Sequence, residues 1–245
     1  MLLHSGFLLA IVSSTLLGAE RANLGSLTIS CPATSKIGCN ESLDPSVTGT
    51  PTTSGECDPA IPATLTYTDS VVVPPCEAQR FDANITRHWT ATDSCGNTAT
   101  CDQVIHVMKE IWKFDIKAQS CPNPFNLGAH GAISMTIVGS AEHDVATIDP
   151  SSIQIWTEHC EGGPVAPIRY HYEDKATPWP GGEACGCHTL GADGFLDLDF
   201  HFRRADVESG LHLDTYPHFS YVRIFVTART QDGCGILGTD CVRVQ

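Results

Sequence analysis

Three aspartates in one short segment have the chemistry of cation ligands. The segment reads Gly191-Ala192-Asp193-Gly194-Phe195-Leu196-Asp197-Leu198-Asp199-Phe200. Calcium takes several oxygen ligands at about 2.3–2.6 Å, and carboxylates at a turn and along a following strand can converge on one ion. The pattern is only part of a calcium loop, because a glycine stands at position 191 where a full loop has Asp or Asn. We predict calcium as a cofactor held by Asp193, Asp197 and Asp199; the alternative is an Asp-Gly turn followed by two solvated carboxylates.

Twelve cysteines offer either metal or disulfide chemistry, and their context favours disulfides. The run Cys185-Gly186-Cys187-His188 supplies at most three zinc ligands and lacks the usual spacing of thiols in zinc sites. We predict that Cys185 and Cys187 bridge to different partners, and that Cys241 pairs with Cys234 or with Cys121. The cysteines divide equally between two halves of the chain, which predicts two independently cross-linked domains: Cys31, Cys39, Cys57, Cys76, Cys95 and Cys101, then Cys121, Cys160, Cys185, Cys187, Cys234 and Cys241.

Histidines and loop carboxylates are the remaining candidates for metal binding or catalysis. The histidines of the second half lack H-x-x-x-H spacing, so a histidine-based site is not favoured: His159, His171, His188, His201, His212 and His218. Segment 158–190 is rich in Pro and Gly and holds carboxylates that could pair for glycoside hydrolysis: Glu158, Glu161, Glu173, Asp174 and Glu183. Solvated loop charges are the simpler interpretation.

The beginning of the chain predicts export. The apolar run from Phe7 to Leu17 has the length of a secretory signal core and is too short for a membrane span. We predict a signal peptide over residues 1–19, a secreted or cell-surface protein, and no membrane insertion. The net charge of −14 leaves no basic stripe for nucleic acid.

The elements that hold these residues are predicted to be strands. Between Ile85 and Ala91, every second residue faces the same way, which is the period of a half-buried strand. Apart from one helical turn within 203–210, no helix is expected. The predicted strands are Leu27–Ser30, Lys36–Cys39, Thr64–Thr68, Ile85–Ala91 and Gln103–Val107, then Phe114–Ile116, Ala132–Val138, Ser152–Trp156, Phe195–Phe202 and Ser220–Ala228. They predict an all-β chain with two domains, 27–108 and 114–245, joined by a short semi-rigid junction.

Separated motifs in the first half fall in the order found in one family. They are Cys31-Pro32, Asp44-Pro45, Gly49, Tyr67-Thr68-Asp69, Arg87, Trp89-Thr90-Ala91-Thr92-Asp93, Cys95-Gly96-Asn97, Cys101, Val104, Ile105 and Val107. Residues 27–108 thereby resemble the hyalin-repeat family of extracellular modules. The resemblance implies an immunoglobulin-like β-sandwich, a Cys31–Cys101 bridge, and a role in adhesion or display. With that bridge assigned from the resemblance, we expect the other four cysteines of this half to pair as Cys39–Cys95 and Cys57–Cys76.

The second half also shows a resemblance. Its marks are Phe114-Asp115-Ile116-Lys117, Cys121-Pro122-Asn123-Pro124, Asn126-Leu127, Gly131, Ile148-Asp149-Pro150-Ser151-Ser152-Ile153, Asp193-Gly194, Asp197-Leu198, Phe200 and Gly238-Thr239-Asp240-Cys241. Residues 114–245 are similar to an uncharacterised domain of secreted bacterial proteins. That similarity implies a second β-sandwich-like domain with long loops, and no particular activity.

These observations lead us to expect a secreted, non-enzymatic protein of structural or adhesive type. Its partner would be an extracellular protein, a glycan or a second copy of the chain. Two alternatives stay open. A carbohydrate-binding protein would expose aromatic side chains, for which the candidates are Trp156, Tyr170, Tyr172 and Trp179. A secreted hydrolase would have its site in 158–190 and an apolar cleft lined by two close carboxylates.

Overall fold

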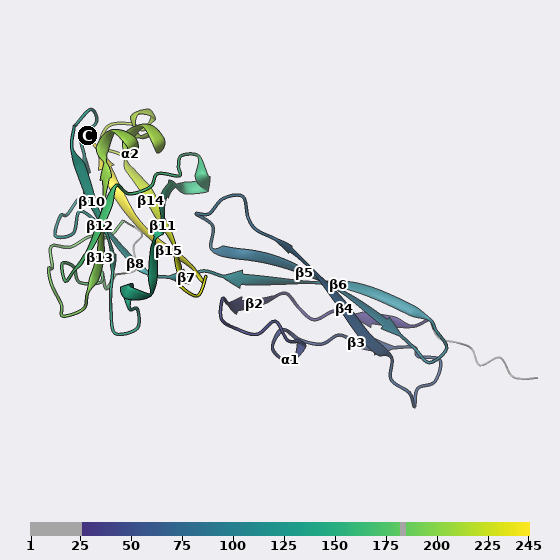
Figure 1. The fold of residues 1–245 in the computed structure, drawn as a ribbon. Coiled ribbons are helices and arrows are strands. Elements are labelled where there is room, and N and C mark those ends of the chain that lie inside the picture. The colour runs from purple at the N-terminus through teal and green to yellow at the C-terminus, as the bar shows by residue number, and fades with distance from the viewer. Residues whose placement is uncertain (1–25, 182–184) are drawn as a thin grey trace, which may run out of the picture.

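Strands dominate the computed structural model, which describes residues 26–181 and 185–245 (Figure 1). The predicted signal peptide, 1–19, lies outside the described residues. The α-helices in the described part are short, α1 (Pro45–Thr48) and α2 (Arg204–Gly210), and three 3-10 turns accompany them: η1 (Val145–Thr147), η2 (Glu158–Cys160) and η3 (Leu213–Thr215). The prediction of an all-β chain is confirmed, and α2 lies where one helical turn was expected.

The first half consists of a four-stranded sheet and a two-stranded sheet. In the larger sheet the order is β2-β6-β5-β4, and in the smaller one β1 pairs with β3. Strand β2 runs parallel to β6, whereas β4, β5 and β6 are antiparallel neighbours. The bounds are β1 (Thr28–Ser30), β2 (Ser35–Gly38), β3 (Thr52–Ser54), β4 (Thr64–Val72), β5 (Phe81–Thr92) and β6 (Thr98–Met108).

The interior of the first half is partly polar. The predicted alternation on β5 is confirmed, because Ile85, Arg87, Trp89 and Ala91 are all buried. The Arg87 guanidinium is 1% exposed, donates to both carboxylate oxygens of Asp69 at 2.8 Å, and lies 4.1 Å from the centre of a tyrosine ring. A bidentate pair between an arginine and a carboxylate has a narrow geometry. The Arg87–Asp69 pair therefore favours one register between β5 and β4.

The second half is a sandwich of two sheets. One has the order β12-β13-β10-β8, and the other β11-β14-β15-β7, with β9 also paired to β15. The bounds are β7 (Glu110–Ile111), β8 (Lys113–Ile116), β9 (Pro124–Phe125), β10 (Ala132–Val138), β11 (Ile148–Thr157), β12 (Arg169–Glu173), β13 (Asp197–Arg203), β14 (Tyr221–Thr230) and β15 (Gly235–Val244). A large apolar core fills the space between the sheets, and it includes Met135, Ile155, Phe200 and Ile224.

All twelve cysteines are paired. The bridges are Cys31–Cys101, Cys39–Cys234, Cys57–Cys95, Cys76–Cys160, Cys121–Cys187 and Cys185–Cys241. The predicted Cys31–Cys101 bridge is confirmed, as are different partners for Cys185 and Cys187. The prediction of two independently cross-linked halves is wrong, because two of the six bridges join the first half to the second.

The long strands explain why Cys39–Cys95 and Cys57–Cys76 do not form. Cys39 follows β2, whose Gly38 pairs with Met108, so it lies at the junction end of the sheet. Cys95 lies in the turn between β5 and β6, at the other end. An eleven-residue strand spans roughly 35 Å, far more than the ~7 Å that a disulfide allows between Cα atoms. Cys57 pairs with Cys95 at the distal end, and Cys76 faces the second half.

The two predicted alternatives for Cys241 are also wrong. Cys234 and Cys241 do not flank a hairpin, because β15 is one continuous strand from Gly235 to Val244 and holds these two cysteines roughly 20 Å apart. Cys121 is occupied by Cys187, and Cys241 pairs with Cys185.

Noncovalent contacts reinforce the junction between the halves. Arg229 on β14 donates two hydrogen bonds to the carboxylate of Asp82, at 3.0 and 3.2 Å. An apolar cluster spans both halves, with Cys76 and Ala78 packed against Trp156. In the described part of the chain, the halves therefore meet through two disulfides, an ion pair, a hydrogen bond from Asn40 to Asp232 and a small apolar contact. Figure 1 shows the described chain beginning at the distal end of the first half and ending at the distal end of the second.

Candidate functional site

The predicted calcium ligands lie at the start of β13 and in the turn before it. Asp193 is exposed, and its carboxylate accepts a hydrogen bond from the backbone N–H of Phe195 at 3.1 Å. Gly194 has a φ of 98°, which a glycine adopts without strain. The Asp174 carboxylate accepts the N–H groups of Asp193 and Gly194. This part of the segment is a hydrogen-bonded turn.

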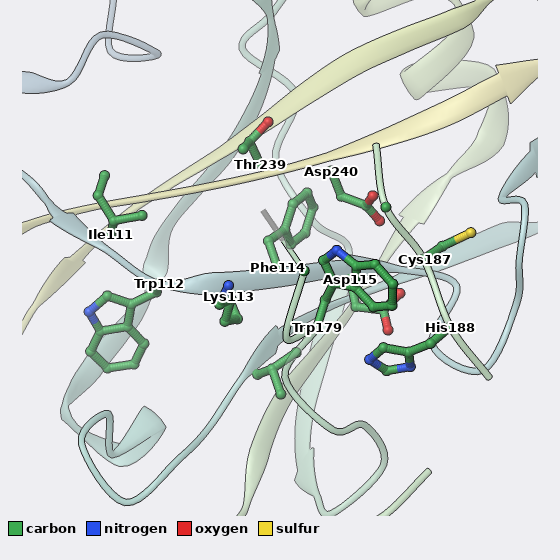
Figure 2. Close-up of a pocket in the computed structure, with 13 residues that line it drawn as sticks. Ile111, Trp112, Lys113, Phe114, Asp115, Trp179, Cys187, His188, Thr239 and Asp240 are labelled. Carbon is green, nitrogen blue, oxygen red and sulfur yellow. The ribbon is translucent and has the colours of Figure 1, made fainter. Parts of the chain in front are cut away.

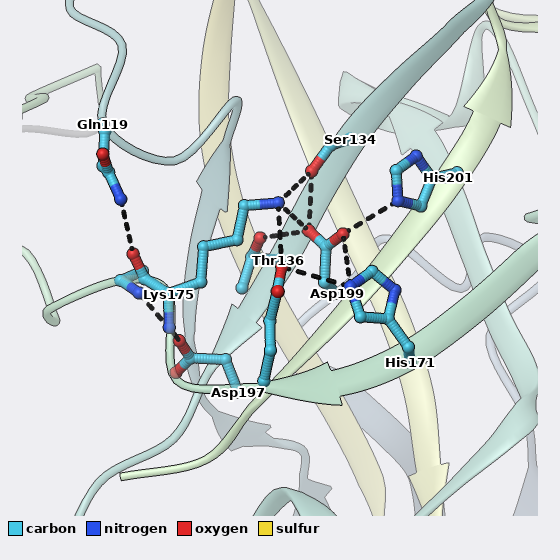
Figure 3. Close-up of polar contacts among 10 residues, drawn as sticks. Gln119, Ser134, Thr136, His171, Lys175, Asp197, Asp199 and His201 are labelled. Atoms are coloured by element: carbon cyan, nitrogen blue, oxygen red, sulfur yellow. Dashed lines mark hydrogen bonds and ion pairs between the residues drawn. The ribbon is translucent and has the colours of Figure 1, made fainter. Parts of the chain in front are cut away.

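Asp197 is fully buried and holds neighbouring backbone in place. One carboxylate oxygen accepts the N–H of Gly139 at 2.9 Å. The other accepts those of Lys175 and Ala176 at 2.8 Å each (Figure 3). Burial raises the pKa of Asp197 above its ordinary value, and these three hydrogen bonds oppose the rise. Both oxygens are thus committed to backbone donors. In the part of the chain that the structure describes, Asp193, Asp197 and Asp199 do not form a group whose oxygens all lie within 4.8 Å. Calcium binding by these three residues stays a prediction.

Asp199 lies at the centre of a different cluster. Its Oδ1 accepts hydrogen bonds from Ser134 at 2.6 Å, Thr136 at 2.8 Å and the Lys175 ammonium at 2.9 Å (Figure 3). Burial alone would raise the pKa of this carboxyl, but the three hydrogen bonds together hold the pKa below its ordinary value. Asp199 is therefore an ionised carboxylate although its side chain is 0% exposed.

Two histidines face the other oxygen of Asp199. The Nε2 atoms of His201 and His171 lie 3.0 and 3.8 Å from Asp199 Oδ2 (Figure 3). The antiparallel register of β12 and β13 places His171 opposite Asp199, and the two-residue period of a strand brings His201 to the same face. Burial lowers the pKa of His201, which favours the neutral imidazole, while the charge of Asp199 opposes the change.

The sequence analysis missed this pair of histidines. Segment 158–190 was interpreted as one elaborated loop, whereas residues 169–173 form an edge strand of the sheet. The missed signal is the run Arg169-Tyr170-His171-Tyr172-Glu173, in which charged or polar residues alternate with tyrosines as expected for a strand. Spacing along the chain could not reveal the cluster, since its ligand groups come from neighbouring strands.

A cavity of about 310 Å³ lies on the same half, between β8, β15 and the segment that carries Cys187 (Figure 2). Its lining combines aromatic and acidic side chains, among them Trp112, Phe114, Asp115, Trp179, His188 and Asp240. Burial, followed by the charge of Asp197, raises the pKa of Asp115 to about 7. Burial also raises the pKa of Asp240 to about 7.

The two cavity carboxylates differ in how they are engaged. Asp240 accepts hydrogen bonds from Ile116 N, Asn123 Nδ2 and Cys241 N, so it supports the edge where the two sheets meet. Asp115 accepts no comparable set of hydrogen bonds in the part of the chain that the structure describes. The nearby Cys185-Gly186-Cys187-His188 run contributes no thiolate, because both cysteines are in disulfides. A Cβ at Gly186 would collide with the Trp179 indole, which explains the glycine.

Three of the five carboxylates considered for hydrolysis take part in other interactions. Glu158 forms an ion pair with Arg223 at 3.0 Å, Glu173 lies 3.1 Å from His171, and Asp174 holds the turn at Asp193. Glu183 lies outside the described residues. The candidate aromatics differ in exposure: Trp156 is buried, with its Nε1 donating to Thr227, whereas Tyr170 and Tyr172 are exposed on β12.

Comparisons with known proteins give no family assignment. No family model matches the chain, and no curated protein matches it. Among solved structures, the Bacteroides ovatus mixed-linkage glucan utilization locus SGBP-B, in complex with a mixed-linkage heptasaccharide, is 10% identical over 75% of this chain and 38% of that one, with a TM-score of 0.24. A 1.5-MDa bacterial ice-binding adhesin is 14% identical over 67% and 43% of the two chains, with a TM-score of 0.25.

A chimeric titin Z1Z2 carrying a decorin peptide covers more of the chain. It is 12% identical over 91% of this chain and 98% of that one, with a TM-score of 0.21. This chain spans about two fifths of the length of the first two structures. At TM-scores this low, the similarities support no argument about function, and the hyalin-repeat resemblance stays a prediction.

Proposed function

We propose that this chain is a secreted structural or adhesive protein that works as a force-resistant spacer outside the cell. The observation that supports the proposal is the placement of the two bridges between the halves, Cys39–Cys234 and Cys76–Cys160. Six disulfides in this chain also favour an oxidising destination. Among the described residues, no helix is long and apolar enough to cross a bilayer.

The bridge between Cys39 and Cys234 gives a short covalent path through the molecule. From residue 26 the path follows β1 and β2 to Cys39, crosses to Cys234, and follows β15 to the C-terminal end. A tension applied to the two ends is therefore transmitted by residues that are already extended. The intervening chain, with a sequence separation of 195, is shielded from stretching.

Single-molecule force spectroscopy tests this function. We expect the oxidised protein, pulled from residue 26 and the C-terminus, to lengthen by no more than a few nanometres before detachment. With the disulfides reduced, the same chain should lengthen by roughly 70 nm, at about 3.5 Å per residue. Extension of the oxidised protein by tens of nanometres would overturn the proposal.

A second candidate function is glycan binding, and the exposed tyrosines of β12 favour it. Tyr170 and Tyr172 are 51% and 40% exposed, with ring centres 6.2 Å apart. Aromatic side chains of this kind offer apolar faces to sugar rings. A glycan array probed with the wild-type chain and with Tyr170→Ala/Tyr172→Ala tests the idea: binding that the double substitution abolishes supports it, and absence of binding to any glycan removes it.

A further inference from the structure

We propose that His171, His201 and Asp199 form a binding site for a divalent transition metal of the zinc type. The three residues are neighbours on β12 and β13, and their ligand atoms all lie within 4.8 Å of one another. The inference is independent of the spacer function and concerns a different ion, with different ligands, from the predicted calcium site.

The spacing of the ligand atoms matches a tetrahedral ion. Zinc lies about 2.0–2.2 Å from imidazole nitrogens and carboxylate oxygens, so two ligands of one tetrahedral ion are roughly 3.3 Å apart. The distances from Asp199 Oδ2 to the two Nε2 atoms, 3.0 and 3.8 Å, bracket this value. The histidine rings are stacked at an angle of 21°, and Figure 3 shows a nitrogen of each ring directed at Asp199.

The oxygen that faces the histidines has a close imidazole contact, His201 Nε2 at 3.0 Å, but forms no hydrogen bond in the described part of the chain. Asp199 Oδ2 is a buried atom without a hydrogen-bond partner among the described residues, although the side chain is 0% exposed. A buried carboxylate oxygen is costly unless a positive charge or a hydrogen-bond donor satisfies it. A metal ion held jointly with the two imidazoles would satisfy it.

The second oxygen of Asp199 has the environment expected around a ligating carboxylate. Ser134, Thr136 and Lys175 all bond to Oδ1, which fixes the orientation of the carboxylate and leaves Oδ2 for the ion. Outer partners of this kind set the direction of metal ligands. The Lys175 ammonium also lies 3.4 Å from Glu173, so its positive charge is shared between two carboxylates.

The donor set and its access favour zinc over calcium. Imidazole nitrogens suit zinc, copper and nickel, whereas calcium takes oxygen ligands. Glu173 Oε1 lies 3.1 Å from His171 Nε2 but does not belong to the group whose ligand atoms all lie within 4.8 Å of one another. The His171 side chain is 46% exposed at the edge of the sheet, so an ion can enter from solvent.

Titration of the oxidised, tag-free chain with Co²⁺ alone, followed by visible absorption and displacement with Zn²⁺, tests the site. We expect one equivalent of Co²⁺ with a four-coordinate spectrum, and affinities at least about tenfold weaker in His171→Ala and in His201→Ala. His88→Ala is the matched control, because His88 also contacts a carboxylate, Asp102 at 2.6 Å, but belongs to no group of three possible ligands among the described residues.

Melting temperatures give a second readout that does not depend on the spectrum. Zn²⁺ should raise the melting temperature of the wild type and of His88→Ala relative to chelator, and should not raise that of His171→Ala. His171 is half-exposed, so its substitution is compatible with folding. Absence of saturable one-to-one binding would overturn the proposal, as would binding that survives both single substitutions or is weakened equally by His88→Ala.

Discussion

At the scale of single residues, buried charges in this protein fall into two kinds. Arg87 is surrounded by partners: Asp69, the hydroxyl of Thr48, and the rings of Tyr67 and Trp89. Asp115, by contrast, is partly buried beside a cavity, and no comparable set of donors surrounds it among the described residues. The first kind stabilises the fold only while every partner is present. The second costs free energy whenever the group is ionised.

Replacement of Arg87 by lysine is expected to destabilise the protein by about 2–4 kcal/mol. A lysine retains the charge but not the planar fork that binds both oxygens of Asp69, so the charge at this buried position is left incompletely paired. Urea unfolding under oxidising conditions measures the change. Arg80→Lys, an exposed position in the same half, should change the free energy by less than about 0.5 kcal/mol. Similar losses for the two variants would contradict this account of Arg87.

Asp115→Asn is expected to stabilise the protein at high pH and not at low pH. The folded-state pKa of about 7 lies above the ordinary value of 3.8, so the folded state binds the proton more tightly. This residue's contribution to stability is complete below about pH 4 and is lost as the pH rises through 7. Asparagine does not titrate, so the variant does not lose this stability as the pH rises.

Melting temperatures of Asp115→Asn and wild type should therefore agree at pH 4 and separate at pH 8, with the variant higher. The charge of Asp197 raises the pKa of Asp115, the charge of Lys175 lowers it, and Asp115 in turn raises the pKa of Asp240. The exposed Asp214→Asn serves as the control and should follow the wild type at both values of pH. A constant difference between Asp115→Asn and wild type across this range would show that titration of Asp115 is not the cause.

At the scale of elements, the alternation of apolar and polar residues predicts where most strands lie but not which strands are neighbours in a sheet. The runs within β5, β10 and β14 were predicted because each buries one face against a core. Strand β12 was missed because its exposed residues lie at the edge of a sheet, where both faces tolerate polar side chains. The cluster around Asp199 was missed with it, since one ligand lies on that strand.

Asp197 is expected to anchor the segment that joins β12 to β13. Its carboxylate accepts the N–H groups of Lys175 and Ala176, so Asp197→Asn replaces one of its acceptors by a donor. We expect faster hydrogen–deuterium exchange at these two amides and a loss of about 1–3 kcal/mol. Mass spectrometry of exchanged peptides measures it. Asp193→Asn should alter exchange only in its own turn, and protection of 175–176 that is unchanged in Asp197→Asn would refute the anchoring role.

At the scale of the whole molecule, the bridges between the halves could not be predicted from cysteine spacing. Equal numbers of cysteines in the two halves suggested separately cross-linked domains. The same equal numbers also result when two cysteines of one half pair with two cysteines of the other. What decides is which end of a sheet each cysteine occupies: Cys39 and Cys76 lie at the junction, and Cys57 and Cys95 lie at the distal end. That information depends on the register of the strands, which becomes available only from the folded structure.

Removal of both bridges between the halves is expected to convert a rigid molecule into a hinged one. In the chain-entropy estimate, closing a loop as long as that of Cys39–Cys234 is worth about 5 kcal/mol, although overlapping bridges do not add. The noncovalent contacts at the junction are few, chiefly Arg229 with Asp82 and the cluster around Trp156. Small-angle X-ray scattering should therefore give the wild-type profile when either pair is replaced by serine, because the other bridge still restrains the junction.

Replacement of all four cysteines, Cys39, Cys76, Cys160 and Cys234, should broaden the distribution of molecular dimensions. The control is Cys31→Ser/Cys101→Ser, which removes a bridge of similar geometry from within the first half and should lower its stability without altering the scattering profile at a temperature where it stays folded. If the fourfold variant scattered like the wild type, the ion pair and the apolar cluster alone would hold the halves together. The disulfides would then act on the unfolded chain rather than on the orientation of the two sandwiches.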